Sequence, residues 1–143
     1  MKIELQYPVF LFDKKDMMVY VFYDDFQMKT TNTKIFNTTN FGGRILVDSR
    51  GMKYITQNAY ITRHWGFWEG ISIRGKVISF EYEYKDAGSP ITLDELKEMI
   101  MERYPHSEWF DSAWCDVEEF KEEMDKCNTF EELALLFRKP SST

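Results

Sequence analysis

The sequence is poor in the residues that metal and nucleophile sites require. It contains two histidines and two cysteines among 143 residues. Zinc sites use three or four Cys, His or acidic ligands, usually in close pairs, whereas His64 and His106 stand apart without such partners. A cysteine nucleophile needs an oriented histidine. His106 precedes Cys115 by nine residues, but acidic neighbours would raise the pKa of that thiol. We therefore predict no metal site and no catalytic residue.

The two cysteines are also predicted not to form a disulfide. Cys115 and Cys127 fall within one predicted helix, where twelve residues correspond to about 18 Å along the axis. A disulfide requires Cα atoms within about 7 Å of each other. Free thiols are typical of proteins from a reducing compartment.

Signatures of phosphate binding, export and membrane insertion are missing as well. There is no GxGxxG or Walker pattern, and Gly42-Gly43 precedes a predicted strand rather than a helix. No apolar run approaches the ~20 residues of a membrane span, and the N-terminus lacks the features of a signal peptide. We predict no cofactor, no membrane partner and a cytoplasmic location.

The Asp and Ser residues that could serve in catalysis occupy positions that turns and helix caps already explain. Asp24, Asp25 and Asp48 are candidates for a carboxylate pair at one end of a sheet, but turn and cap positions account for all three. Ser49 and Ser112 also occupy a predicted turn and a predicted cap. The chain is therefore expected not to be an enzyme.

What the sequence does contain is apolar and acidic. Hydrophobic residues make up 43% and aromatic residues 17%, enough to bury a core, so disorder is not expected. The net charge of -6 is uneven: residues 1–89 hold 12 basic and 10 acidic residues, and residues 90–143 hold 6 and 14. An acidic surface repels nucleic acid and favours a cationic partner.

Period-two alternation predicts a hairpin between Ile71 and Tyr84. Ile78, Phe80, Tyr82 and Tyr84 share one parity, and polar residues dominate the other. This is the pattern of a strand with one face on a core. We expect the hairpin near the middle of a sheet that helices cover.

Further strands are expected on the N-terminal side of this hairpin. Apolar, β-rich runs lie at Pro8–Phe12, Met17–Tyr23, Arg44–Asp48 and Met52–Thr56. Residues 58–63 form another strand or continue the last one past a bulge.

The segment between the second and third strands is predicted to be irregular. One helical turn can follow Asp24-Asp25, and Thr30–Asn40 is rich in Thr and Asn. Such side chains bond to the local backbone and favour turns. We expect a flexible loop there.

Helical signals begin after Pro90. Thr92 and Glu95 have the spacing of a capping box, and Pro105 ends the run. Thr129 and Glu132 repeat the capping spacing at a third, short helix.

A second helix is predicted after Asp111 or Ser112. Its apolar residues recur at spacings of three and four: Ala113, Val117, Phe120, Met124 and Cys127. The opposite face carries the acidic residues Asp116, Glu118, Glu119, Glu122, Glu123 and Asp125.

Strands followed by helices indicate the α+β class. We predict a single domain, 1–143, with an antiparallel sheet of five or six strands in residues 1–89. About three helices in residues 90–139 cover one face of that sheet, and residues 140–143 fray.

Two aromatic clusters stand out. Trp65 and Trp68 lie in a Gly-bounded segment that is either a core plug or an exposed contact patch, since Trp dominates binding hot spots. Trp109, Phe110 and Trp114 lie between the first two helices, where we expect core packing.

Four segments resemble the small cytoplasmic immunity proteins of bacterial polymorphic-toxin and contact-dependent growth inhibition systems. They are Ile45–Tyr54, Ile91–Lys97, Trp109–Trp114 and Thr129–Leu133. The resemblance implies one-to-one binding of a cognate toxin domain, often a basic nuclease. Family folds are diverse, so no binding residue is carried over by motif.

The prediction is thus a non-enzymatic inhibitor that contacts a toxin. The expected contact residues are Asp116, Glu118, Glu119, Glu122 and Glu123, with Trp65 and Trp68 as a second patch. The alternative is a small-molecule-binding domain or minor enzyme with an aromatic cleft between sheet and helices, lined by residues such as Tyr82, Tyr84 and Trp68. A structural or adaptor domain without a pocket is the third possibility.

Overall fold

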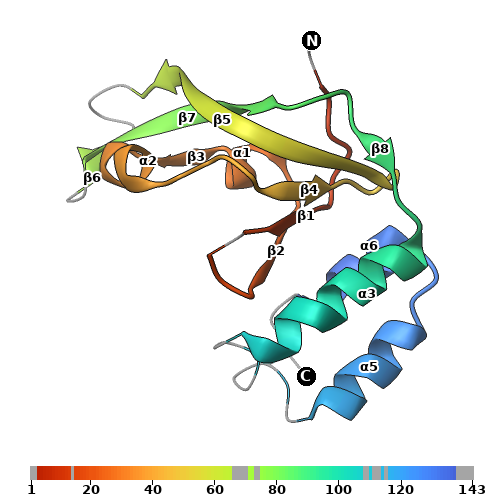
Figure 1. The fold of residues 1–143 in the computed structure, drawn as a ribbon. Coiled ribbons are helices and arrows are strands. Elements are labelled where there is room, and N and C mark those ends of the chain that lie inside the picture. The colour runs from red at the N-terminus through yellow and green to blue at the C-terminus, as the bar shows by residue number, and fades with distance from the viewer. Residues whose placement is uncertain are drawn as a thin grey trace.

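The protein has the predicted α+β architecture, with an antiparallel sheet built before the main helices in the chain. A computed structural model describes residues 3–13, 15–65, 71–72, 75–107, 110, 114 and 116–137. In Figure 1 the curled sheet occupies the upper part of the molecule, and the C-terminal helices lie below the strands β1 and β2.

Within the described residues, six strands form one continuous order and two short strands pair with it. The strands are β1 (Val9–Phe12), β2 (Val19–Phe22), β3 (Thr30–Asn32), β4 (Ile45–Val47), β5 (Met52–His64), β6 (Ile71–Ser72), β7 (Gly75–Tyr84) and β8 (Ser89–Pro90). The order is β2-β1-β4-β5-β7-β3, with β6 paired to β7 and β8 paired to β5. All pairings are antiparallel, as predicted.

The longest strand, β5, bends the sheet. Its start pairs with β4 over Lys53–Ile55, and its remainder pairs with β7. The register shifts between Thr56 and Asn58 and again between Ile61 and Arg63. Such irregularities increase local twist and curl a sheet. Residues 58–63 therefore continue the strand past an irregularity, which is one of the two predicted possibilities.

The segment after β2 is more regular than predicted. A helix α1 (Asp25–Met28) follows Asp24, whose side chain accepts a hydrogen bond from the Gln27 N–H. Thr30–Asn32 then pairs with β7, and α2 (Thr33–Thr38) begins directly after it. The prediction of a flexible loop over Thr30–Asn40 is wrong because these polar residues form an edge strand and a helix cap, with Asn32 accepting from the Ile35 N–H.

The C-terminal region is helical, as expected. The predicted start of the second helix after Asp111 or Ser112 is wrong, because Asp116 has extended backbone and caps a helix that begins at Val117. Its elements are α3 (Leu93–Arg103), the 3-10 turn η1 (Tyr104–His106), α5 (Val117–Asp125) and α6 (Phe130–Leu135). Thr92 and Glu95 form the predicted capping box. At α6 the Glu132 carboxylate accepts from the Asn128 N–H (2.7 Å) while Thr129 accepts from the Glu132 N–H (3.0 Å). The second capping box is therefore imperfect, because the Glu132 carboxylate binds the N–H of Asn128, one residue before the cap residue Thr129.

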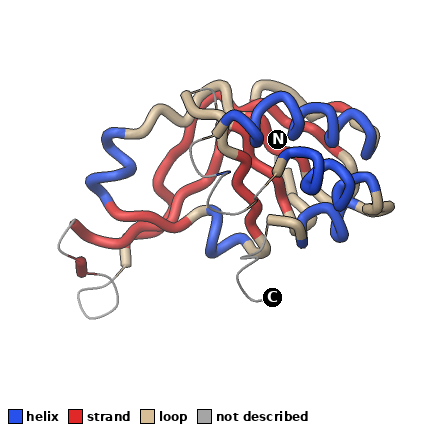
Figure 2. The backbone as a smooth tube through the Cα atoms, turned by 90° about the horizontal axis from the view of Figure 1, so that it is seen from below, coloured by secondary structure: helices blue, strands red, loops and turns tan. Residues whose placement is uncertain are grey.

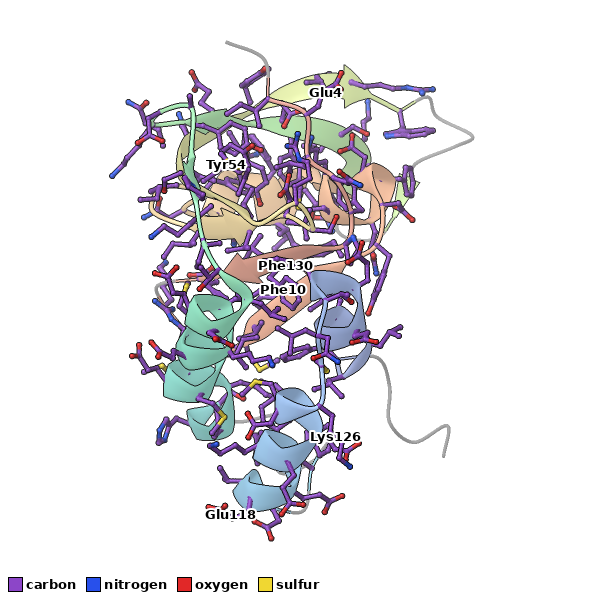
Figure 3. All side chains as sticks on the ribbon, turned by 90° about the vertical axis from the view of Figure 1, so that its right-hand side faces the viewer. Glu4, Phe10, Tyr54, Glu118, Lys126 and Phe130 are labelled. Carbon is purple, nitrogen blue, oxygen red and sulfur yellow. The ribbon has the colours of Figure 1, made fainter. Side chains whose placement is uncertain are left out.

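The strand β1 lies between two hydrophobic clusters and is buried along its whole length. Phe10 and Phe12 join a cluster with residues of the C-terminal helices, among them Phe120. Val9 and Leu11 join a second cluster with aromatic residues of the loop before β4 and of β7. In Figure 3, Phe10 and Phe130 lie where the sheet meets the helices.

The hairpin β6–β7 does not lie beneath the C-terminal helices. Phe80 and Tyr82 belong to the second cluster, which contains no described residue of α3, α5 or α6. In Figure 2 those helices gather at one end of the sheet, and β5 and β7 extend away from them. The hairpin is also not near the middle of the sheet as expected, because β7 lies between β5 and the edge strand β3. Residues of β1, β2 and β4 share a hydrophobic cluster with the helices.

The second aromatic cluster behaves as predicted where it is described. Phe110 is buried and packs against Tyr104 and Phe120, and Trp114 packs edge-on against Phe120 at 5.0 Å. Trp109 and Cys115 lie outside the described residues. Cys127 is a buried free thiol whose pKa is raised by desolvation.

Candidate functional site

The acidic face predicted on the second helix lies on the exposed side of α5. Glu118, Glu119 and Glu122 are exposed, and none has a hydrogen bond or ion pair from its carboxylate to another described residue. In Figure 3, Glu118 lies at the end of the molecule opposite Glu4. These three side chains present negative charge to solvent without a direct hydrogen bond or ion pair to a described residue.

Two of the five predicted acidic residues have local partners. The Asp116 side chain caps α5 by accepting from the Glu118 N–H at 2.9 Å. The Glu123 carboxylate is 2.8 Å from the Lys126 ammonium, and its side chain is 43% exposed. Both residues therefore contribute less free charge than the sequence pattern suggests.

Burial of the opposite face holds α5 in place. Phe120 is 0% exposed and Met124 is 2% exposed, and both lie in the helical core cluster. Phe120 contacts the rings of Tyr104 and Trp114 at 5.2 Å and 5.0 Å between centroids. The acidic residues thus project from a helix whose orientation is set by aromatic packing.

The predicted aromatic patch is separate from α5. Trp65 follows β5, and its Nε1–H donates to the Ser79 hydroxyl at 3.1 Å. Its ring packs edge-on against Phe26, which is 61% exposed, and the Arg63 guanidinium lies 3.9 Å from the ring centroid. Trp68 lies outside the described residues. In Figure 1 the end of β5 and the helix α5 lie on opposite sides of the molecule, so these residues do not form one site.

A cavity of about 230 Å³ lies within the curl of the sheet. Its lining comes from β1, β2, α1, β3, α2, β7 and the residues before β4. Buried apolar walls are provided by Leu11, Met28, Phe41 and Phe80. The cavity is therefore bordered by the short helices α1 and α2 and not by the C-terminal helices, which differs from the predicted aromatic cleft.

An ion pair between Arg44 and Asp13 lies at the lining of this cavity. The Arg44 Nη2 lies 3.0 Å from the Asp13 Oδ2, and the two side chains are 17% and 15% exposed. The Arg44 Nη1–H donates to the Tyr82 hydroxyl oxygen at 3.1 Å. Burial raises the pKa of Tyr82, so the phenol stays protonated. The lining of the cavity thus combines apolar side chains with an ion pair that has no net charge and with the Tyr82 phenol.

Of the two other aromatic residues of the predicted cleft, only Tyr84 is described. It lines a separate surface hollow of about 830 Å³ together with Ile3 and Tyr60. Its hydroxyl is buried and has no hydrogen-bond partner among the described residues. Tyr82 also lines this hollow, so it borders both hollows, whereas Tyr84 does not line the cavity in the curl of the sheet.

A buried lysine is a feature that the sequence did not reveal. Lys29 is 7% exposed, and its ammonium lies 2.7 Å from the Glu81 carboxylate and 3.0 Å from the Asp25 carboxylate. Burial alone would raise the pKa of Asp25, but hydrogen bonds from the Tyr7 hydroxyl and from Lys29 hold it below its usual value. No local pattern marks this group, because Lys29, which directly follows α1, and Glu81 of β7 are 52 positions apart in the sequence.

Replacing Asp25 by Asn is expected to weaken the acid dependence of stability. The pKa of Asp25 is lower in the folded chain than its ordinary value. Its ionised form therefore stabilises the fold above about pH 4, and this contribution is lost as pH falls through the folded pKa. Thermal unfolding between neutral and acidic pH should show a smaller drop in Tm for D25N than for the wild type.

The control for this experiment is Glu83→Gln, which removes an exposed carboxylate of β7. This variant should follow the wild-type pH profile. Identical profiles for D25N and the wild type would contradict a stabilising role for the ionised Asp25.

Neither a metal site nor a membrane-spanning helix is present among the described residues. The described part of the chain holds no group of three or more His, Cys, Asp or Glu residues that could bind a metal ion. No described helix is long and apolar enough to cross a membrane. In comparisons with family models, curated proteins and solved structures, nothing matches this chain.

Proposed function

We propose that this protein binds and neutralises a cognate bacterial toxin domain, a basic nuclease, through the exposed face of α5. The observation that carries the proposal is the set of unpaired carboxylates of Glu118, Glu119 and Glu122 on a helix whose other face is buried. The protein acts as a stoichiometric inhibitor and not as an enzyme.

Charge complementarity supports a basic partner. Residues 90–143 hold 14 acidic and 6 basic residues, so the acidic α5 lies within the acidic part of the chain. Such a field accelerates association with a positively charged surface. A nuclease carries such a surface because its substrate affinity comes largely from cationic contacts to phosphate. For the same reason nucleic acid itself is not the partner.

The arrangement of the helices supports a preformed contact. In this proposal α3, α5 and α6 form a layer on one face of β2, β1 and β4, and the carboxylates of α5 point outward from that layer. Since Phe120 and Met124 already anchor the helix, little ordering accompanies binding, and a preorganised surface binds more tightly.

Trp65 supplies a second, smaller candidate contact. Its ring lies against Phe26 and Arg63 at the far side of the molecule from α5. A toxin domain bound at α5 would leave this patch exposed unless it wraps around the sheet. The proposed inhibitor acts where its toxin acts, which we place in the cytoplasm.

Co-expression with the gene immediately upstream in the native operon tests the proposal. The expected results are toxicity of that gene product alone, rescue of growth by this protein and one-to-one co-purification. Binding should weaken as salt is raised, because salt screens exposed charges. Absence of both toxicity and complex formation would refute the proposed function.

A small-molecule-binding domain is the second candidate function. The observation that favours it is the cavity of about 230 Å³ with a polar group, Arg44, and a phenol, Tyr82, at its lining. Ligand pockets typically combine apolar walls with a few placed polar groups. A thermal-shift screen of small compounds, run on the purified protein, tests this candidate.

A further inference from the structure

The cavity in the curl of the sheet contains hydrogen-bond donors that the described residues do not satisfy. A guanidinium carries five N–H groups. In Arg44 the Nε–H and one Nη2–H face Asp13, and one Nη1–H faces the Tyr82 oxygen. Two N–H groups of Arg44 therefore have no acceptor among the described residues.

Tyr82 adds a further donor. Its hydroxyl oxygen accepts from Arg44, so its own proton is available for an acceptor, and none is found in the part of the chain that the structure describes. The residue is only 3% exposed. A buried donor without an acceptor destabilises a fold, so such groups usually meet a protein, water or ligand oxygen. Arg44 and Tyr82 thus favour an oxygen atom beside them in the cavity.

The size and walls of the cavity favour a single ring. Its volume is about 230 Å³, whereas an apolar cavity of about 150 Å³ is known to hold benzene. Phe41 and Phe80 provide aromatic walls, with their ring centroids 5.0 Å apart. The remaining room suits one small polar substituent on the ring.

The charges at the lining favour an uncharged compound. Arg44 and Asp13 form an ion pair, so together they carry no net charge. An ionised ligand placed in this cavity would lack a counter-charge, and burying an unpaired charge is strongly unfavourable. A neutral carbonyl oxygen can accept from both donors without that penalty.

We infer that this cavity binds an uncharged, single-ring aromatic compound whose carbonyl oxygen accepts hydrogen bonds from Tyr82 and Arg44. The inference rests on the second candidate function, small-molecule binding, and is independent of the acidic face of α5.

Benzamide is the probe for the first experiment, because it combines one ring with a neutral carbonyl group. Titration into the full-length protein, followed by amide NMR, is expected to shift signals of Phe41, Arg44 and Phe80, with a Kd on the order of 1 mM for so small a ligand. Benzoate, which is ionised at neutral pH, should bind about tenfold more weakly or not at all.

Two variants locate the site. Tyr82→Phe removes one donor and retains the ring, and it should weaken benzamide binding roughly fivefold to tenfold. The matched control is Tyr60→Phe, a half-exposed tyrosine of β5 that does not line this cavity, and it should bind as the wild type does. Ile35→Trp places a larger side chain at a lining position that is 40% exposed, and it should abolish binding without disturbing the core.

Each result has a defined meaning. Benzamide that fails to shift the cavity amides, or that binds Tyr82→Phe as tightly as the wild type, overturns the inferred ligand class. If other small rings, benzoate included, still shift those amides and are blocked by Ile35→Trp, small-molecule binding stands while the uncharged carbonyl class fails. If no compound in a fragment set shifts them, the second candidate function fails together with the inference.

Discussion

Reversing two charges on α5 is expected to abolish binding of the cognate toxin domain. The variant is Glu118→Lys with Glu122→Lys, two exposed residues one helical turn apart and therefore on the same face. Attraction to a basic surface becomes repulsion, and charge pairs in such interfaces contribute several kcal/mol. The affinity should fall by at least about 100-fold, measured by calorimetry at low salt and by loss of growth rescue.

The chain offers a closely matched control on another helix. Glu98→Lys with Glu102→Lys reverses two exposed glutamates of α3 at the same spacing. Both double variants change the net charge equally, so a general electrostatic effect would weaken binding equally in both. An equal loss would show that α5 is not the contact, and an unchanged affinity of the α5 variant would refute the proposed interface.

Neither charge reversal should unfold the protein. All four glutamates are exposed, and surface substitutions usually change stability by less than about 0.5 kcal/mol. Far-UV circular dichroism and Tm therefore separate a lost contact from a lost fold.

Truncating Phe120 to Ala is expected to produce the largest loss of stability. Phe120 is 0% exposed and touches the rings of Tyr104, Phe110, Trp114 and Phe137. Phe-to-Ala changes in cores typically reduce the free energy of unfolding by about 3–5 kcal/mol, because they remove transfer free energy and leave a cavity. Urea unfolding followed by circular dichroism measures the change.

The control is Val117→Ala, which shortens an apolar side chain on the same helix. Val117 is 39% exposed and should change the free energy of unfolding by less than about 1 kcal/mol. A similar loss for both variants would mean that burial of the Phe120 ring does not cause the loss, because Ala favours the helix more than either residue that it replaces. A negligible loss for Phe120→Ala would contradict the packing of Phe120 in the helical core cluster.

Helices and strands whose signals come from residues close together in the sequence were predicted correctly. The alternation of Ile78, Phe80 and Tyr82 places buried side chains on one face of β7. The capping box of Thr92 and Glu95 begins α3 where the sequence predicts it. Both signals depend on residues within a few positions of one another, so the sequence alone contains them.

The acidic face was predicted in outline and refined by the structure. The apolar stripe of α5 correctly places Phe120 and Met124 in the core. Periodicity does not show that Asp116 would cap the helix or that Lys126 would pair with Glu123. Because of these local partners, only Glu118, Glu119 and Glu122 of the five predicted residues have carboxylates without a partner among the described residues.

The sequence by itself determined the class of fold, the starts of α3 and α6 and the acidic surface, because each follows from residues close together along the chain. Only the tertiary structure decided the cavity, where Asp13, Arg44 and Tyr82 come from separate parts of the sheet. It also decided the burial of Lys29 between Asp25 and Glu81. These groups meet because irregular pairing curls the sheet, and strand order and curvature depend on contacts between distant residues that no local pattern records.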